Sequence, residues 1–127
     1  MNKPGKNTQI LFVDHNRLVR DSAAAIFAEQ GYQTVAAEDG FDALCRLAEQ
    51  PPGIIFMATS MPRLDGFQSC ALIRTSKQFA STPIVLLSSD YGPLEKARAE
   101  LAGANRFLQK PFSRKELLSA VEELSQA

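Results

Sequence analysis

Short apolar, β-prone segments recur along this 127-residue chain, and segments with helical periodicity separate them. The expected strands are Ile10–Val13, Thr34–Ala37, Ile54–Met57, Ile84–Leu87 and Phe107–Leu108, the second being the weakest. Strands that are apolar throughout and alternate with helices are typical of a parallel sheet with helices on both faces and right-handed crossovers. The pattern therefore predicts an α/β fold, a doubly wound five-stranded parallel sheet built from five βα units.

Apolar stripes and capping residues mark the helices of these units. The first helix ends near Gly31 and carries its stripe on Val19, Ala23, Ile26 and Phe27. The last helix begins with a capping box, Ser113 to Glu116, and carries its stripe on Leu117, Leu118, Val121 and Leu124. The helices between them are expected at Phe41–Ala48, Phe67–Thr75 and Leu94–Leu101.

Length and composition indicate one domain over residues 1–127, with a core over about residues 8–125 behind a short polar N-terminal tail. The 14 Lys and Arg residues balance the 14 Asp and Glu residues, so the basic excess of nucleic-acid-binding proteins is missing. No apolar run reaches the length of a membrane span, which favours a cytoplasmic protein. Cys45 and Cys70 lack metal or disulfide spacing and are interpreted as small apolar residues on helices.

The residues that follow each strand form the candidate site, because a doubly wound sheet binds ligands at the carboxyl ends of its strands. They are Asp14 and His15, then Ala58, Thr59 and Ser60, then Ser88, Ser89 and Asp90, and finally Lys110. No glycine-rich loop follows the first strand, which disfavours a nucleotide- or flavin-binding protein. Ser88 has no His or carboxylate at motif spacing, which disfavours an enzyme with a serine nucleophile.

Four ordered segments resemble the receiver domains of bacterial response regulators, namely Ile10–Asp14, Met61–Gly66, Pro83–Ser88 and Lys110–Phe112. The resemblance implies the flavodoxin-like (βα)5 receiver fold with strand order 2-1-3-4-5. It also implies a signalling protein of a two-component or chemosensory phosphorelay rather than an enzyme. Further stretches are similar to stand-alone receivers of the chemosensory systems that control type IV pilus twitching motility, namely Gly40–Leu44, Pro62–Gly66, Cys70–Ile73 and Lys110–Ser113.

The same resemblance implies a phosphorylation pocket that is incomplete in this chain. Receivers carry an acidic pair after the first strand, where this chain has Asp14 and His15, and a phosphoacceptor Asp at the end of the third strand, where it has Ala58. Ser60 follows in the next loop. A methyl group cannot attack a phosphodonor, and two of the oxygen ligands that hold Mg²⁺ in the family are missing. No metal or other cofactor is therefore expected, and Asp14 is the residual acid of the pocket.

Ser88 and Lys110 match the hydroxyl and the lysine of the family pocket, and Ser88 and Phe107 match its switch positions. A partly buried Lys110 would need Asp14 as its partner, because an unpaired buried ammonium is costly. We interpret His15 as a loop residue rather than a pH-sensing group. The hydroxyls of Thr59 and Ser60 are expected to form hydrogen bonds with local backbone, as Ser and Thr commonly do at strand ends. Asp65 is expected to cap the third helix, because an acid at a helix start complements the helix dipole.

These observations predict a receiver-like module that signals through binding, independently of phosphorylation. Its expected partners are signalling proteins, either a histidine kinase or an output component of pilus motility. The resemblance implies that they bind the face formed by the fourth helix, the fifth strand and the fifth helix. Neither nucleic-acid binding nor membrane insertion is expected. The alternative is a conventional phosphoacceptor receiver that a change of Asp to Ala at position 58 has inactivated.

Overall fold

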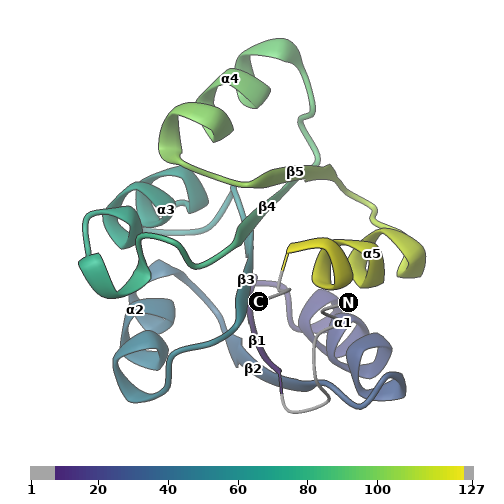
Figure 1. Cartoon of the computed structure of the whole chain (residues 1–127). Helices are drawn as coiled ribbons and strands as arrows, with labels where there is room; N and C mark the ends of the chain where they lie inside the picture. Colours follow the sequence, from purple (N-terminus) through teal and green to yellow (C-terminus); the bar gives the residue numbers. More distant parts are fainter. Residues whose placement is uncertain (1–7, 125–127) are drawn as a thin grey trace.

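A computed structural model describes residues 8–124 of the chain as one parallel sheet flanked by helices (Figure 1). The strands are β1 (Gln9–Val13), β2 (Gln33–Ala37), β3 (Ile54–Ala58), β4 (Ile84–Ser88) and β5 (Arg106–Gln109). The helices are α1 (Arg17–Glu29), α2 (Gly40–Glu49), α3 (Gly66–Arg74), α4 (Pro93–Ala102) and α5 (Arg114–Leu124), with a 3-10 turn η1 (Lys77–Phe79) before β4. The expected N-terminal tail over residues 1–7 and the end of the expected core at residue 125 lie outside the described residues.

The strands follow the order β2-β1-β3-β4-β5, and all four neighbouring pairs are parallel. This order confirms the predicted doubly wound α/β fold. The expected strands agree with the observed ones to within one residue at each end. In the register of β1 and β3, Val13 lies opposite Met57, so that Asp14 and Ala58 follow side by side.

Helices cover both faces of the sheet, with α1 and α5 on one face and α2, α3 and α4 on the other (Figure 1). Successive residues of a strand point to opposite faces, so each strand supplies both layers of the core. On the α1 and α5 side, Phe27 packs on Phe56 with 5.3 Å between ring centroids. On the other side, Met57 and Leu86 pack against Cys70 and Ile73 of α3.

The predicted helix ends agree with the structure, whereas the burial of the cysteines followed from the sequence only in part. The capping box of α5 is confirmed, since Ser113 Oγ accepts a hydrogen bond from Glu116 N and Glu116 Oε1 accepts one from Ser113 N. Gly31 has a φ of 82° just after the Gln30 C-cap of α1. Cys45 and Cys70 both lie on helices, as interpreted from the sequence, but only Cys70 fills space in the core. Cys45 is exposed on α2, about 200° around the helix from the buried Ala43.

Parallel strands bring their carboxyl ends to one edge of the sheet, which places the loops after β1, β3, β4 and β5 along that edge. Within residues 8–124, no helix combines the length and the apolar character needed to cross a membrane.

Candidate functional site

Asp14 is fully buried at the end of β1, and both of its carboxylate oxygens are engaged. Its Oδ2 accepts a hydrogen bond from Lys110 Nζ at 2.6 Å, and its Oδ1 accepts one from Asn16 N at 2.9 Å. Lys110 is held at the end of β5 by a hydrogen bond from its backbone N to Ser88 O. The pairing expected for a partly buried Lys110 is thereby confirmed, and the two charges cancel.

The loop that carries Asp14 is held at two further points. Arg20 of α1 donates a hydrogen bond from Nη1 to the backbone oxygen of Asp14 at 2.7 Å. The side chain of Asn16 caps α1 by accepting hydrogen bonds from Leu18 N and Val19 N. The Arg20 contact could not be predicted from the sequence, because an arginine near the start of a helix belongs to no recognised motif.

Ala58 ends β3 with a side chain that is 1% exposed. The start of α3 packs directly on this strand end, since Gly66 N donates a hydrogen bond to Thr59 O at 2.9 Å. A Cβ atom at Gly66 would lie only 2.2 Å from Ala58 O. The cap expected at Asp65 is confirmed, because its side chain accepts a hydrogen bond from Gln68 N in a capping box. The methyl of Ala58 offers neither a nucleophile nor a metal ligand.

Ser88 ends β4 and is 5% exposed. Its Oγ accepts a hydrogen bond from Asp90 N at 3.0 Å, which fixes the start of the loop to α4.

His15 is more than half exposed, and its Nδ1 lies 3.8 Å from Asp14 Oδ1. Ser60 is exposed and lines a separate hollow with Glu95 and Arg98. The structure therefore brings Asp14 and Lys110 into contact, while Ser60 faces away from them.

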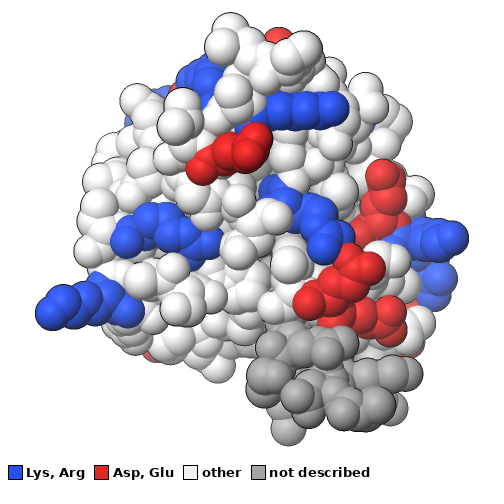
Figure 2. Space-filling view, turned by 45° about the horizontal axis from the view of Figure 1, so that its top comes forward, with Lys and Arg blue, Asp and Glu red and all other residues white. Residues whose placement is uncertain are grey.

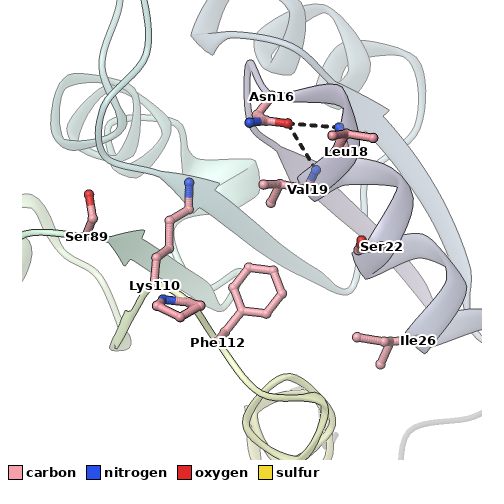
Figure 3. Close-up of a pocket in the computed structure, with 9 residues that line it drawn as sticks. Asn16, Leu18, Val19, Ser22, Ile26, Ser89, Lys110 and Phe112 are labelled. Carbon is pink, nitrogen blue, oxygen red and sulfur yellow. Dashed lines mark hydrogen bonds between the residues drawn. The ribbon is translucent and has the colours of Figure 1, made fainter.

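A hollow of about 530 Å³ adjoins this pair, between α1 and the segment after β5 (Figure 3). Lys110 and Phe112 line one wall, with Ser89 nearby. The α1 wall is formed by Asn16, Leu18, Val19, Ser22 and Ile26. Apolar side chains make up most of this lining, so the hollow suits an apolar group better than a charged one.

The residues at this edge do not fit a divalent cation. Mg²⁺ requires a nearly octahedral set of oxygen ligands. Asp14 already uses both oxygens for Lys110 and Asn16, and Ala58 supplies no side-chain oxygen. Among residues 8–124, no three His, Cys, Asp or Glu side chains are grouped so that they could hold a metal ion.

A second buried acid, Asp39, lies at the N-cap of α2. Arg63, 24 residues away in the loop before α3, forms an ion pair with its Oδ2 and lies over the Phe41 ring at 5.1 Å. The hydrogen bond from Asp42 N, followed by that from Arg63, holds the pKa of Asp39 below its ordinary value. Arg63 has a φ of 70°, which no pattern in the sequence indicated.

Charged side chains are scattered over the face shown in Figure 2 rather than gathered into one basic patch. This distribution agrees with the equal numbers of basic and acidic residues in the chain. The described residues on this face therefore form no continuous basic surface of the kind that binds nucleic-acid phosphates.

Comparison with known proteins identifies a family and several similar proteins. Residues 10–122 match the family model of the response regulator receiver domain. The chain is 39% identical over 122 residues to Protein PilG of Pseudomonas aeruginosa, which covers 96% of this chain and 90% of that protein. Other curated relatives are longer, and the chain spans 50% of the response regulator MprA and 18% of the sensor kinase CqsS.

Solved structures share the fold closely. The chemotaxis response regulator CheY4 of Vibrio cholerae superposes with a TM-score of 0.88 at 27% identity, covering 93% of this chain and 98% of that one. The receiver domain of sensor histidine kinase PA1611 from Pseudomonas aeruginosa PAO1 superposes with a TM-score of 0.87 at 27% identity, covering 94% and 98%. That second structure has a magnesium ion coordinated in its active site cleft.

Proposed function

The chain belongs to the response regulator receiver domain family, and from this premise we propose that it signals by binding protein partners without accepting a phosphoryl group. Receiver domains are signalling modules of two-component and chemotaxis systems. In this proposal the whole chain, residues 1–127, is one such module, and Asp14, His15, Ala58, Ser88 and Lys110 form a degenerate pocket without catalytic activity. Ser60, which was expected in this pocket, lines a separate hollow.

The observation that carries the proposal is the end of β3. At the position where the family resemblance places the phosphoacceptor Asp, this chain has the buried methyl group of Ala58. A receiver is phosphorylated when a carboxylate attacks the phosphodonor, and a methyl group has no electron pair for that attack. The hydroxyl of Ser60 is no substitute, because it is exposed and lies in a hollow with Glu95 and Arg98 rather than beside Lys110.

The contact between Lys110 and Asp14 supports the same proposal. In a receiver that is phosphorylated, a lysine stabilises the negative charge of the phosphoryl group. Here Lys110 Nζ already lies 2.6 Å from Asp14 Oδ2. One ammonium and one carboxylate leave the pocket without the negative charge that would attract Mg²⁺.

The test uses acetyl phosphate with Mg²⁺ and intact-protein mass spectrometry. We expect the mass to stay unchanged, while a receiver with an intact phosphoacceptor Asp gains one phosphoryl group under the same conditions. Titration with Mg²⁺ or Mn²⁺ should cause no saturable amide NMR shifts around Asp14 and Ala58. A phosphoryl adduct that hydroxylamine removes would show an acyl phosphate and overturn the proposal.

We further propose that the partners belong to a pilus chemosensory system, either its histidine kinase or an output component. The similarity to Protein PilG supports this assignment, as do the motifs of the sequence. The proposed binding face consists of α4, β5 and α5, which includes the exposed Lys96 beside Phe107. Lys96→Ala should weaken binding to the kinase of the same system equally with and without a phosphodonor, as measured by calorimetry. Unchanged affinity would place the interface elsewhere.

A further inference from the structure

The loop between β4 and α4 places an aromatic ring directly on Phe107. The rings of Tyr91 and Phe107 are stacked, with 5.0 Å between centroids and an interplanar angle of 20°. The Tyr91 hydroxyl donates a hydrogen bond to the backbone oxygen of Phe107 at 3.1 Å. The Lys96 ammonium lies 4.3 Å from the centroid of the Tyr91 ring. Tyr91 is therefore tied to Phe107 through both its ring and its hydroxyl, and to α4 through Lys96.

The loop that carries Tyr91 is itself anchored on both sides. Before Tyr91, the backbone N of Asp90 donates a hydrogen bond to Ser88 Oγ at 3.0 Å. After it, the backbone N of Gly92 donates a hydrogen bond to Asp90 Oδ1 at 3.4 Å, next to the first turn of α4. The backbone on both sides of Tyr91 is therefore held by hydrogen bonds, and these bonds fix the position from which the Tyr91 ring extends.

Phe107 has partners on its other side as well. It is half-buried and packs against the apolar cluster between the sheet and the helices α2, α3 and α4. A ring between a close-packed core and a stacked tyrosine has little room to reorient. Tyr91 and Phe107 also line a hollow of about 330 Å³ between α4 and β5, together with Lys96 and Arg106. The shape of this hollow thus depends on where the two rings lie.

We propose that Tyr91 is a positioning residue that holds Phe107 in one orientation and thereby fixes the surface between α4 and β5. This inference rests on the proposed function, in which that surface binds partners without a phosphoryl trigger. Phe107 occupies a switch position of the family. The stack would keep this residue from switching, and the surface would present one shape to its partners at all times.

The experiment follows the Phe107 ring by NMR in protein labelled at phenylalanine, with its signals assigned through their loss in Phe107→Leu. In the parent chain the stacked tyrosine should shift the Phe107 ring signals upfield. Tyr91→Ala removes the ring that causes this shift, so the orientation of Phe107 is followed by its χ1 coupling constants, which should change from the values of one rotamer to averaged values. Tyr91→Phe should retain most of the ring shift and shift the Leu108 amide signal, because the lost hydroxyl binds the oxygen of the peptide group shared by Phe107 and Leu108.

Tyr32→Ala is the matched control, because Tyr32 is the other tyrosine of the chain and packs on the opposite face of the sheet. It should leave the Phe107 signals in place. Phe107 χ1 couplings that report one rotamer in Tyr91→Ala, as in the parent chain, would overturn the inference. If Tyr91→Ala fails to fold, Tyr91→Phe decides: an upfield ring shift with an altered Leu108 amide supports the inference, and an unchanged Leu108 amide contradicts it.

The two proposals fail in different ways. The phosphodonor and Mg²⁺ experiments test the pocket and involve no signal from Phe107. A fixed Phe107 ring in a chain that becomes phosphorylated would contradict the proposed function and leave the role of Tyr91 intact. A freely averaging Phe107 ring in a chain that is never phosphorylated would contradict only the role of Tyr91.

Discussion

At the scale of single residues, two buried carboxylates at one edge of the sheet are each paired with a cation from a distant part of the chain. Asp14 pairs with Lys110, 96 residues away, and Asp39 pairs with Arg63. Burying a carboxylate costs several kcal/mol unless a cation and hydrogen bonds compensate it. Both pairs therefore have a structural role, which compensates the charge of each buried carboxylate.

The first prediction concerns the balance between Asp14 and Lys110. Lys110→Met leaves the fully buried Asp14 without its cation and should lower the free energy of unfolding by about 2 to 3 kcal/mol, less than for a fully buried pair because Lys110 is partly exposed. Asp14→Asn combined with Lys110→Met should cost less than the two single changes added together. Urea unfolding of the parent chain, the two single variants and the double variant measures this coupling. Lys115→Met, at an exposed lysine, is the control. Additive losses would show that the two groups do not interact.

The second prediction concerns acid stability. The pKa of Asp39 lies below its ordinary value of 3.8, so its ionised form stabilises the fold above that pH, and this contribution disappears as the pH falls through the lowered pKa. The difference in unfolding free energy between the parent chain and Asp39→Asn should therefore be largest near neutral pH and shrink below pH 3.8. Urea unfolding across this pH range measures it.

Arg63→Met provides a graded control for the acid prediction. It should remove only part of the effect, because the hydrogen bond from Asp42 N to Asp39 remains and is the larger cause of the lowered pKa. A difference between the parent chain and Asp39→Asn that stays constant with pH would contradict the prediction.

At the scale of elements, the start of α3 is placed by a backbone contact in addition to the side-chain packing of Cys70 and Ile73 on the sheet. The amide of Gly66 donates a hydrogen bond to Thr59 O, and there is no room for a Cβ atom beside Ala58 O. The capping box of Asp65 and Gln68 then fixes the direction in which the helix leaves. A glycine at this helix start allows the helix to approach the end of β3 closely, and so shapes the floor of the candidate site.

The third prediction tests this close approach. Gly66→Ala should lower the free energy of unfolding by about 1 to 3 kcal/mol, because the added methyl group meets backbone that cannot move without shifting α3 or β3. Gly92→Ala, at the start of α4, should cost less than about 1 kcal/mol, since its Cβ would lie 3.6 Å from the nearest atom, the side-chain oxygen of Asp90. Thermal unfolding measures the stability of both variants. Equal losses of unfolding free energy in Gly66→Ala and Gly92→Ala would contradict the prediction.

At the scale of the whole molecule, the sequence predicted the architecture well because each strand is a short apolar run and each helix has its own stripe and caps. Such information is local, and the strand order followed from the family resemblance. The contacts of Arg20, Arg63 and Tyr91 could not be predicted in the same way. Arg63 and Tyr91 join loops to residues 24 and 16 positions away, and their contacts depend on how the sheet brings those segments together. The Arg20 contact spans only six residues but depends on the path of the loop between β1 and α1.

The same difference applies to the candidate site. Asp14, Ala58, Ser88 and Lys110 can be identified from the sequence because each lies at or directly after the end of a strand, and the parallel sheet brings these strand ends to one edge. The exposure of Ser60 could not be predicted from the sequence, because side chains of successive loop residues follow no fixed pattern of orientation. The hydrogen bond between Ser88 Oγ and Asp90 N was hidden for the same reason.

The fourth prediction asks whether the sheet still holds the frame of a phosphorylation pocket. Ala58→Asp restores a nucleophile beside Asp14, as the register of β1 and β3 requires, and His15→Asp restores a second acid. The double variant should bind Mg²⁺ and gain one phosphoryl group from acetyl phosphate, whereas Ala58→Asp alone should do so weakly. The effects should exceed the sum of the single changes, because both carboxylates act through one metal ion. Amide NMR measures Mg²⁺ binding, and mass spectrometry measures labelling. A folded double variant that does neither would show that Ser88 and Lys110 are not placed to hold a phosphoryl group.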